Sequence, residues 1–296
     1  MPNLKSDVTH PELDMLLKRA WQTRVANFAL TIQFDYPLDT ALISLTGTQC
    51  SLNCAHCGGH YLEHMIPIWE AVERIGAKAP SALISGGSDS EGCVPVTVHL
   101  EKVAALHHGR QLNWHVGLIG EMEAQTIAPY ADVISLDFVG DDDTIQEVYG
   151  LEKTVADYVE SYQICRRYAR VVPHITVGLR GGELGHERPA MDKLARLGLD
   201  GLVFLVFMPT PGTRYADCQP PAVVDVAIIL AEARLRFPDK PIYLGCMRPK
   251  GHHRTALDPL AVHAGVNKIV SPTRPAVHLA ESLGLSIVRG RECCAL

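Results

Sequence analysis

The sequence lacks a long apolar run. None of its apolar stretches reaches the roughly 18–20 residues that a helix needs to cross a bilayer. The amino-terminal stretch MPNLKSDVTHPELDMLLKRA carries charges throughout and contains no apolar segment typical of a signal peptide. We therefore expect no membrane span and no secretion signal, and the sequence predicts a cytoplasmic protein in a reducing compartment.

The sequence also lacks a long basic run, a Pro/Ser-rich linker and a fixed repeat. Its formal net charge is −6, whereas proteins that bind nucleic acids cluster Lys and Arg against the phosphates. A nucleic-acid partner is therefore not expected. The absence of a repeat excludes a solenoid. The 296 residues, 47% of them apolar, suffice for one domain with a sizeable core.

What the sequence does contain is an alternation of short apolar runs and amphipathic segments. The runs predict strands at 41–45, 82–85, 113–118, 133–137, 171–177, 201–207, 241–244 and 268–270. The segments between them predict helices near 61–76, 97–107, 121–129, 151–168, 188–197, 221–236, 256–264 and 275–283. Strands that alternate with helices indicate βαβ units and a parallel sheet. The sequence thus predicts an α/β fold, either a (β/α)₈ barrel or a partial TIM barrel, with a doubly wound open sheet as the alternative.

The same pattern divides the chain into three segments of a single domain. Residues 1–38 are predicted as a helical lead-in, because leucines recur at helix spacing between positions 13 and 17. Residues 39–290 are predicted to form the barrel. Residues 291–296 are predicted as a tail that contains cysteine.

Chemically active residues gather where the predicted strands end. In α/β barrels the active site lies at the carboxyl ends of the strands and in the loops that follow. The predicted strands run into or contain the segments TGTQCSLNCAHCGG, SGGSDSEGC, SLDFVGDDD, VGLRGG, MPTPGTRY and LGCMRPKG. His115 and His174 lie within apolar strands, where a histidine suits a hydrogen-bonded core as well as a site. We expect one functional face.

Three cysteines in the first of these loops indicate a metal centre. Cys50, Cys54 and Cys57 form a C-x₃-C-x₂-C pattern. Thiolates select iron–sulfur clusters, and three of them leave one iron of a four-iron cubane open for a ligand. The alternative is a structural zinc site completed by His56 or His60, since structural zinc takes four ligands.

This motif, placed after the first barrel strand, resembles that of the radical S-adenosylmethionine (SAM) superfamily. The resemblance implies a [4Fe–4S] cluster whose open iron binds SAM, and an electron donor such as ferredoxin or flavodoxin. Reductive cleavage of SAM would give methionine and a 5′-deoxyadenosyl radical. The partial TIM barrel would be of the radical SAM type. By the same resemblance, the residues expected to bind SAM or the cofactor are Gly86, Gly87, Ser88, His56, Asp137, His174 and Arg248.

Three of these expectations have alternatives. Asp137 also suits a cap of the loop that follows its strand. Ser88 and Asp89 stand where the family usually has an acid after its paired glycines, so the resemblance does not carry over a side-chain contact there. Arg248 can bind a planar anion or a cluster sulfide, and it suits a salt bridge at the barrel rim equally well.

The later segments are similar to the biotin synthase-like branch, and most similar to the subunits of two-component lipoyl synthases. This resemblance implies a radical SAM sulfurtransferase of lipoate biosynthesis, which inserts sulfur into an octanoyl chain on a lipoyl carrier protein. A second radical SAM subunit is a possible partner. The alternatives are a lyase, mutase or methylase of the same branch that acts on a small molecule, and an iron–sulfur scaffold without enzymatic activity.

Sulfur insertion implies a second, auxiliary iron–sulfur cluster. Its expected ligands are Cys246, Cys293 and Cys294, with Cys93 as the fourth and Cys218 in reserve. The tail that carries Cys293 and Cys294 is expected to fold back over the mouth of the barrel. Cys165 lies in the middle of a predicted helix and is expected to be a packing residue.

Overall fold

The chain forms one curved, all-parallel sheet of eleven strands with the order β11-β1-β10-β9-β8-β7-β6-β5-β4-β2-β3. The computed structural model describes residues 11–75 and 79–296. The strands are β1 Thr31–Asp35, β2 Thr40–Ser44, β3 Ile66–Pro67, β4 Ser81–Ser85, β5 Gln111–His115, β6 Val133–Asp137, β7 Val171–Val177, β8 Leu202–Val206, β9 Ile242–Leu244, β10 Lys268–Val270 and β11 Ser286–Gly290. The sheet curls into a half-barrel, and this confirms the predicted partial TIM barrel.

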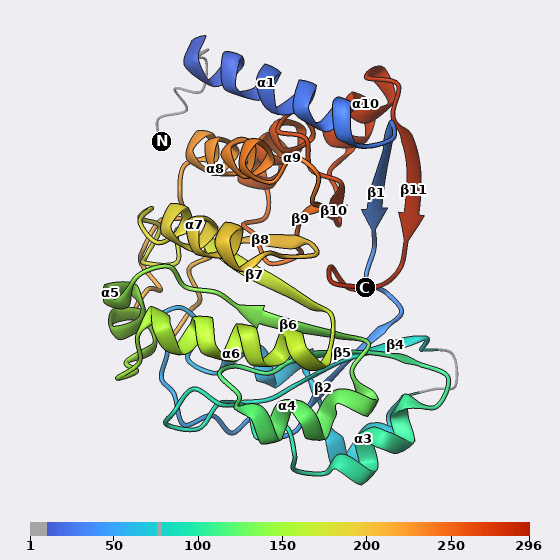
Figure 1. Ribbon diagram of the computed structural model, residues 1–296, viewed down its shortest axis with the longest axis vertical. Helices are drawn as coiled ribbons and strands as arrows, with labels where there is room; N and C mark the ends of the chain where they lie inside the picture. Colours follow the sequence, from blue (N-terminus) through green and yellow to red (C-terminus); the bar gives the residue numbers. More distant parts are fainter. Residues whose placement is uncertain (1–10, 76–78) are drawn as a thin grey trace.

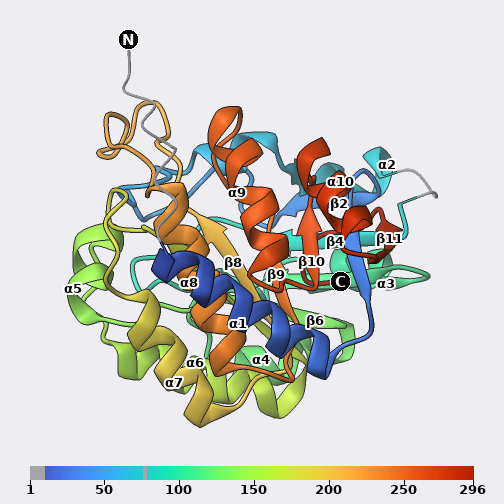
Figure 2. The ribbon, with the colours of Figure 1, turned by 90° about the horizontal axis from the view of Figure 1, so that it is seen from above.

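Helices cover the sheet in the order of the chain. They are α1 Pro11–Asn27, α2 Ile68–Arg74, α3 Leu100–His107, α4 Glu121–Ile127, α5 Asp142–Thr144, α6 Val155–Tyr168, α7 Glu187–Leu197, α8 Val223–Arg236, α9 His252–His263 and α10 Arg274–Ser282. Short helices of other types are η1 His60–His64, η2 Ala128–Tyr130 and the π-helix η3 Ile145–Tyr149. Figure 1 shows strands β4 to β9 and helices α3, α4, α6, α7 and α8 succeeding one another from the lower to the upper part of the molecule. Helix α1 packs across α8 (Figure 2).

The central strands are buried on both faces, which is why their sequences read as continuous apolar runs. β6 (VISLD) and β7 (VVPHITV) contain only one half-buried residue each. Helix α6 begins with a capping box, in which Thr154 and Asp157 exchange hydrogen bonds with each other's backbone. All eight predicted strands are present, within two or three residues of their predicted bounds.

Three strands were missed, namely β1, β3 and β11, and all three belong to the sheet. Residues 31–35, predicted as part of a helical lead-in, form β1 instead, because they pair with both β10 and β11. Within the described part of the predicted lead-in, residues 11–38, α1 is helical and the segment that follows belongs to the sheet, whereas residues 1–10 lie outside the described residues. The helix predicted at 61–76 is interrupted at Pro67 and splits into η1, β3 and α2. Its last residue, 76, lies outside the described residues.

Within residues 11–75 and 79–296, no helix has the length and apolar character that crossing a bilayer requires.

Candidate active site

The cysteine loop that follows β2 is fixed by backbone hydrogen bonds from three other parts of the chain. The Ser51 N–H donates to the Ser88 carbonyl at 2.8 Å, in the loop after β4. The Ala55 N–H donates to the Val148 carbonyl at 2.7 Å, in η3, and the Tyr215 N–H donates to the Ala55 carbonyl at 3.0 Å. The loop therefore has one defined conformation, although it carries no helix or strand.

The thiols of this loop are near enough to affect one another. Cys54 is buried, and Cys50 and Cys57 are half-buried. The Cys54 thiol donates a hydrogen bond to Cys57, and this bond, with a contribution from His56, lowers the pKa of Cys57 to about 4. The same bond, together with burial, raises the pKa of Cys54. Thiolates are the form of cysteine that binds metals. One of the three is thus ionised at neutral pH even without a metal.

The zinc alternative requires ligands that converge on one ion. In the described part of the chain, no group of three or more His, Cys, Asp or Glu side chains is arranged to hold a single metal ion. In a cubane cluster each cysteine binds a different iron, so such convergence is not needed.

Gly87, in the loop after β4, touches the cysteine loop directly. A Cβ atom at this position would lie 2.0 Å from the Gln49 carbonyl oxygen and 2.6 Å from the Cys50 Cα. The Gly87 N–H donates to Thr46 Oγ1 at 2.7 Å, and that hydroxyl donates to the Gln49 carbonyl at 2.8 Å. Only glycine allows the two loops this close approach. Sequence reasoning missed Thr46, whose position between β2 and the first cysteine was the available signal.

Ser88 takes part through its backbone. Its carbonyl accepts the Ser51 N–H at 2.8 Å and lies 3.8 Å from Cys50 Sγ. Ser88 thus joins the loop after β4 to the cysteine loop through its backbone.

Asp137, at the end of β6, has one carboxylate oxygen engaged and one open. Oδ2 lies 3.3 Å from Nε2 of His115, at the end of β5, and these side chains keep 41% and 32% exposure. Oδ1 is buried and has no hydrogen-bond partner. A buried acceptor without a partner is costly in a finished protein, so Oδ1 is suited to a hydroxyl or amine of a ligand. His115 was considered only as an uncertain core residue and proves to be the partner of Asp137.

Electrostatics favour an ion pair between Asp137 and His115. Burial favours the neutral carboxyl of Asp137, but His115, with His174 and His56, outweighs it and lowers the pKa to about 2. Burial disfavours the charged imidazolium of His115, but the carboxylate of Asp137 has the larger combined effect, so the pKa of His115 is raised. Asp137 is therefore anionic throughout the physiological range.

We expect an NMR titration of His115 in the folded protein to give a pKa above 6.5, and the Asp137→Asn variant to give a lower one. Because the folded pKa is raised, the stability that His115 contributes is complete below about pH 6.5 and is lost as pH rises through the folded value. The pKa of Asp137 is depressed in the folded protein. The stability that Asp137 contributes is therefore present at pH values above its unfolded pKa, and it is lost as pH falls towards about 2. An unchanged His115 titration in Asp137→Asn would contradict the ion pair.

His174 and His56 each present a nitrogen toward the site. His174, on β7, is 5% exposed, and its Nδ1 lies 3.1 Å from the Val172 carbonyl. Burial, together with His115, lowers the pKa of His174 to about 4, so it is neutral at pH 7. The His56 ring meets Tyr149 edge-on at 5.6 Å, and its Nδ1 is buried without a hydrogen-bond partner. Tyr149, in η3, was not singled out in the sequence.

Arg248 has a structural role, and its expected role in binding the cofactor is not supported. The side chain is fully buried, and Nε and Nη2 bind the Asp258 carboxylate at 3.0 and 3.1 Å. Its remaining hydrogen bonds go to the carbonyls of Gly245, Val270 and Ser271. All its nitrogens are engaged, so no donor remains for a ligand. The structure thus has Arg248 in an ion pair with Asp258, which is the alternative that the sequence left open.

Substituting Arg248 by Met should lower the free energy of unfolding by about 3–5 kcal/mol, because Asp258 would remain as an unpaired buried charge. Denaturant melts monitored by circular dichroism measure this loss. The double variant Arg248→Met/Asp258→Leu removes both charges and should recover much of it. A single variant as stable as the parent would show that the pair is not a structural element.

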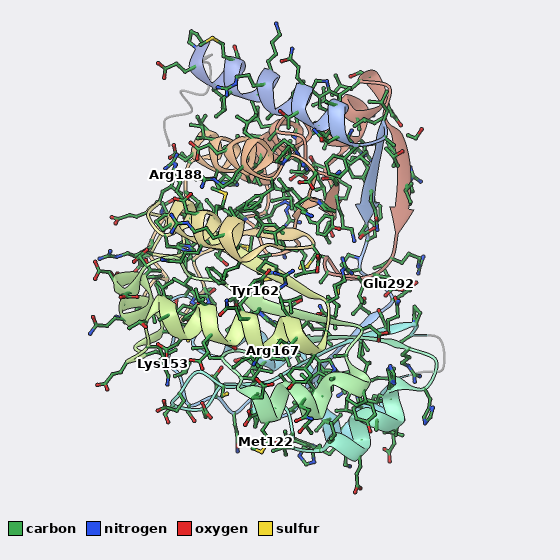
Figure 3. The ribbon with its side chains drawn as sticks, in the orientation of Figure 1. Met122, Lys153, Tyr162, Arg167, Arg188 and Glu292 are labelled. Atoms are coloured by element: carbon green, nitrogen blue, oxygen red, sulfur yellow. The ribbon has the colours of Figure 1, made fainter. Side chains whose placement is uncertain are left out.

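The residues at the C-terminus lie inside the half-barrel. Glu292 hydrogen-bonds to Ser81 of β4 and Thr40 of β2 (Figure 3). Ala295 packs with Val133 of β6 and Val172 of β7. These contacts lie in the first halves of the strands, so residues 291–296 fill the amino-terminal part of the barrel interior. They do not cover its mouth at the carboxyl ends, as had been expected.

This tail brings three of the expected auxiliary ligands together. Cys294 is 9% exposed, and burial, together with the neighbouring thiols of Cys246 and Cys293, raises its pKa. The Asn113 amide donates to Cys293 Sγ at 3.3 Å. Cys246 follows β9 and is the one cysteine with an exposed side chain. We refer to Cys246, Cys293 and Cys294 as the lumen cysteines.

Cys93, expected as the fourth ligand, faces elsewhere. Its thiol donates to the Leu118 carbonyl, and its backbone forms an isolated bridge with Gly117. Burial is the main cause of its raised pKa, and the nearest charges that contribute are Asp89 and Glu123, not the lumen cysteines. These contacts hold the Cys93 thiol at the Leu118 carbonyl. Cys218 lies beside Gly181, and Cys165 is buried in α6, where it packs.

No protein-family model matches the sequence, and no curated protein matches it. Solved structures do. Methylornithine synthase (PylB) superposes with a TM-score of 0.67 at 16% identity over 95% of this chain and 90% of that one. The hydrogenase maturase HydG from Carboxydothermus hydrogenoformans gives 0.70 at 13% identity over 94% and 72%. Streptococcus suis SuiB bound to SAM gives 0.53 at 14% identity over 79% and 58%. At these identities the comparison shows the fold alone, a parallel α/β partial barrel.

Proposed function

We propose that this protein is a radical SAM enzyme. One observation carries the proposal: the C-x₃-C-x₂-C loop is in direct backbone contact with Gly87. The cysteine loop follows β2 and the glycine turn follows β4, and these two strands are neighbours in the sheet. The proposed cluster-binding loop thus lies beside a turn that allows a ligand to come close. The SAM-bound neighbour supports this, because it places the same cofactor on the same fold.

The residues present fit a [4Fe–4S] cluster with SAM. Cys50, Cys54 and Cys57 would each hold one iron, leaving the fourth for SAM. When reduced, such a cluster supplies the electron that cleaves SAM into methionine and a 5′-deoxyadenosyl radical. Asp137 would accept hydrogen bonds from the ribose at Oδ1, the oxygen that has no partner in the protein. His115 would hold the other oxygen and keep the carboxylate ionised.

His56 and the glycine turn would bind the two ends of SAM. The His56 ring, oriented by Tyr149, would lie against the adenine. Gly86 and Gly87 would present backbone to the methionyl amine, since their lack of side chains permits a close approach.

Within this class we propose sulfur insertion into an octanoyl chain carried on a lipoyl carrier protein. The support is the position of Cys293 and Cys294, which the tail carries inside the half-barrel, with the Cys246 thiol near them. An auxiliary iron–sulfur cluster bound there would supply the sulfur. The partners would be the octanoylated carrier, a second radical SAM subunit and ferredoxin or flavodoxin as electron donor, in the cytoplasm.

A small-molecule lyase, mutase or methylase remains the second candidate. The observation that favours it is the superposition on methylornithine synthase, which covers most of both chains. An enzyme of this kind needs no auxiliary cluster. The lumen cysteines would then serve packing and hydrogen bonding alone.

One experiment tests both levels of the proposal. Anaerobically reconstituted protein is incubated with SAM, dithionite and octanoylated carrier protein, with and without a second lipoyl synthase subunit. We expect 5′-deoxyadenosine by chromatography and a gain of sulfur in the carrier by mass spectrometry. Absence of 5′-deoxyadenosine under all conditions would refute the radical SAM proposal. 5′-Deoxyadenosine without sulfur in the carrier would instead favour the second candidate.

A further inference from the structure

A buried polar contact inside the half-barrel joins a histidine of the sheet to a cysteine of the tail. His174 Nε2 lies 3.6 Å from Cys294 Sγ. The two residues are 5% and 9% exposed. His174 stands in the fourth position of β7, paired with Val203 of β8, so its backbone is held within the sheet. The contact therefore lies between a rigid strand and the tail that carries two of the lumen cysteines.

The other nitrogen of His174 is already engaged. Nδ1 lies 3.1 Å from the Val172 carbonyl, which can only accept a hydrogen bond. Nδ1 therefore carries the proton, and Nε2 offers a lone pair to the interior. Metal-binding histidines show this pattern, with one ring nitrogen donating to a carbonyl or carboxylate and the other bound to the metal.

The separation of the pair suits two ligands on one metal ion. With metal–sulfur and metal–nitrogen bonds of about 2.3 and 2.0–2.1 Å, two ligands at a tetrahedral ion lie roughly 3.5 Å apart. The distance between Sγ and Nε2 is 3.6 Å. In a cubane each iron has a single protein ligand, whereas each iron of a two-iron cluster has two. The pair thus matches an iron of a two-iron cluster.

Resting on the proposed auxiliary cluster, we propose that His174, and not Cys93, is its fourth protein ligand. Cys294 and His174 bind one iron of a [2Fe–2S] cluster, and Cys246 and Cys293 bind the other. Two ligands for each iron also agree with the absence, in the described part of the chain, of any three such side chains around one ion.

The surroundings suit an anionic cluster. Lys268 Nζ donates to the backbone carbonyls of Cys294 and Leu296, and its charge also acts on both tail thiols. The Asn113 amide donates to Cys293 Sγ, and hydrogen bonds to sulfur stabilise such clusters. Asp35, which pairs with Lys268 at 3.1 Å, balances part of the positive charge.

The test uses the full-length Cys50→Ala/Cys54→Ala/Cys57→Ala variant, in which only the auxiliary cluster can form. After anaerobic reconstitution we expect about two irons per chain. The reduced cluster should show nitrogen hyperfine coupling by pulsed electron paramagnetic resonance. Labelling with ¹⁵N-histidine should change the size of that coupling by the ratio of the gyromagnetic ratios of ¹⁵N and ¹⁴N. The same labelling applied to the protein without substitutions gives the result independently of how the variants fold.

Two further substitutions in that background identify the ligand. His174→Cys should retain the iron and lose the nitrogen coupling. His115→Ala is the matched control, since its ring lies 5.7 Å from that of His174 but its Nε2 faces Asp137. This variant should keep the coupling. Coupling that survives His174→Cys would overturn the assignment.

The iron count separates the possible failures. About four irons per chain without nitrogen coupling would refute the His174 assignment and leave a cubane auxiliary cluster in place. No iron in the triple variant would refute the auxiliary cluster altogether. Formation of 5′-deoxyadenosine by the parent protein tests the radical SAM proposal separately from both results.

Discussion

Replacing Cys50, Cys54 and Cys57 together by Ala should reduce 5′-deoxyadenosine formation to the level of protein without iron. Each cysteine holds a different iron in the proposed cluster, and no side chain nearby is arranged to replace them among the described residues. Iron should fall by about four per chain. Anaerobic reconstitution, iron determination and chromatography of the SAM products measure both effects.

Cys165→Ala is the matched control for this triple variant. Cys165 is also a buried free cysteine, but it lies in α6 and packs in the core. Its replacement should leave iron and SAM cleavage near the parent values. Normal 5′-deoxyadenosine formation by the triple variant would refute the radical SAM proposal, and colourless protein that binds zinc would restore the structural zinc alternative.

Gly87→Ala should disrupt the cluster without removing any ligand. The new methyl group would lie 2.0 Å from the Gln49 carbonyl oxygen and 2.6 Å from the Cys50 Cα. Both are backbone atoms, which cannot move aside as the end of a flexible side chain can. The cysteine loop must therefore shift, and we expect loss of about four irons per chain together with loss of SAM cleavage.

The adjacent glycine provides the control. A Cβ at Gly86 would meet side-chain atoms of Thr46 and Val94 at 3.3–3.4 Å, and these atoms can give way by a few tenths of an ångström. Gly86→Ala should therefore keep most of its iron. Equal iron loss in the two variants would show that the close approach at Gly87 is not what positions the loop.

These two predictions address the same structural relation, because the cysteine loop depends on the loop after β4 for its shape. The hydrogen bonds from Gly87 to Thr46 and from Ser51 to the Ser88 carbonyl connect the two loops. Parallel strands place such loops at the same edge of the sheet. Residues about 40 positions apart in the chain therefore act as one binding unit.

The sequence by itself determined the central strands and the cysteine motif. Strands buried on both faces, such as β6 and β7, appear as short continuous apolar runs that end in polar or glycine residues. The motif is equally local, because its three cysteines lie within eight residues of the chain. The fold class followed from the alternation of these runs with amphipathic segments.

Only the tertiary structure decided where the ends of the chain lie and which distant side chains meet. β1 and β11 are five residues each and pair with each other across about 250 positions, so no local pattern distinguishes them from a helix or a loop. Arg248 turned to Asp258 because burial leaves an arginine no alternative to pairing and hydrogen bonding. Cys294 reached His174 because the tail enters the barrel from β11, whose position depends on long-range pairing within the sheet.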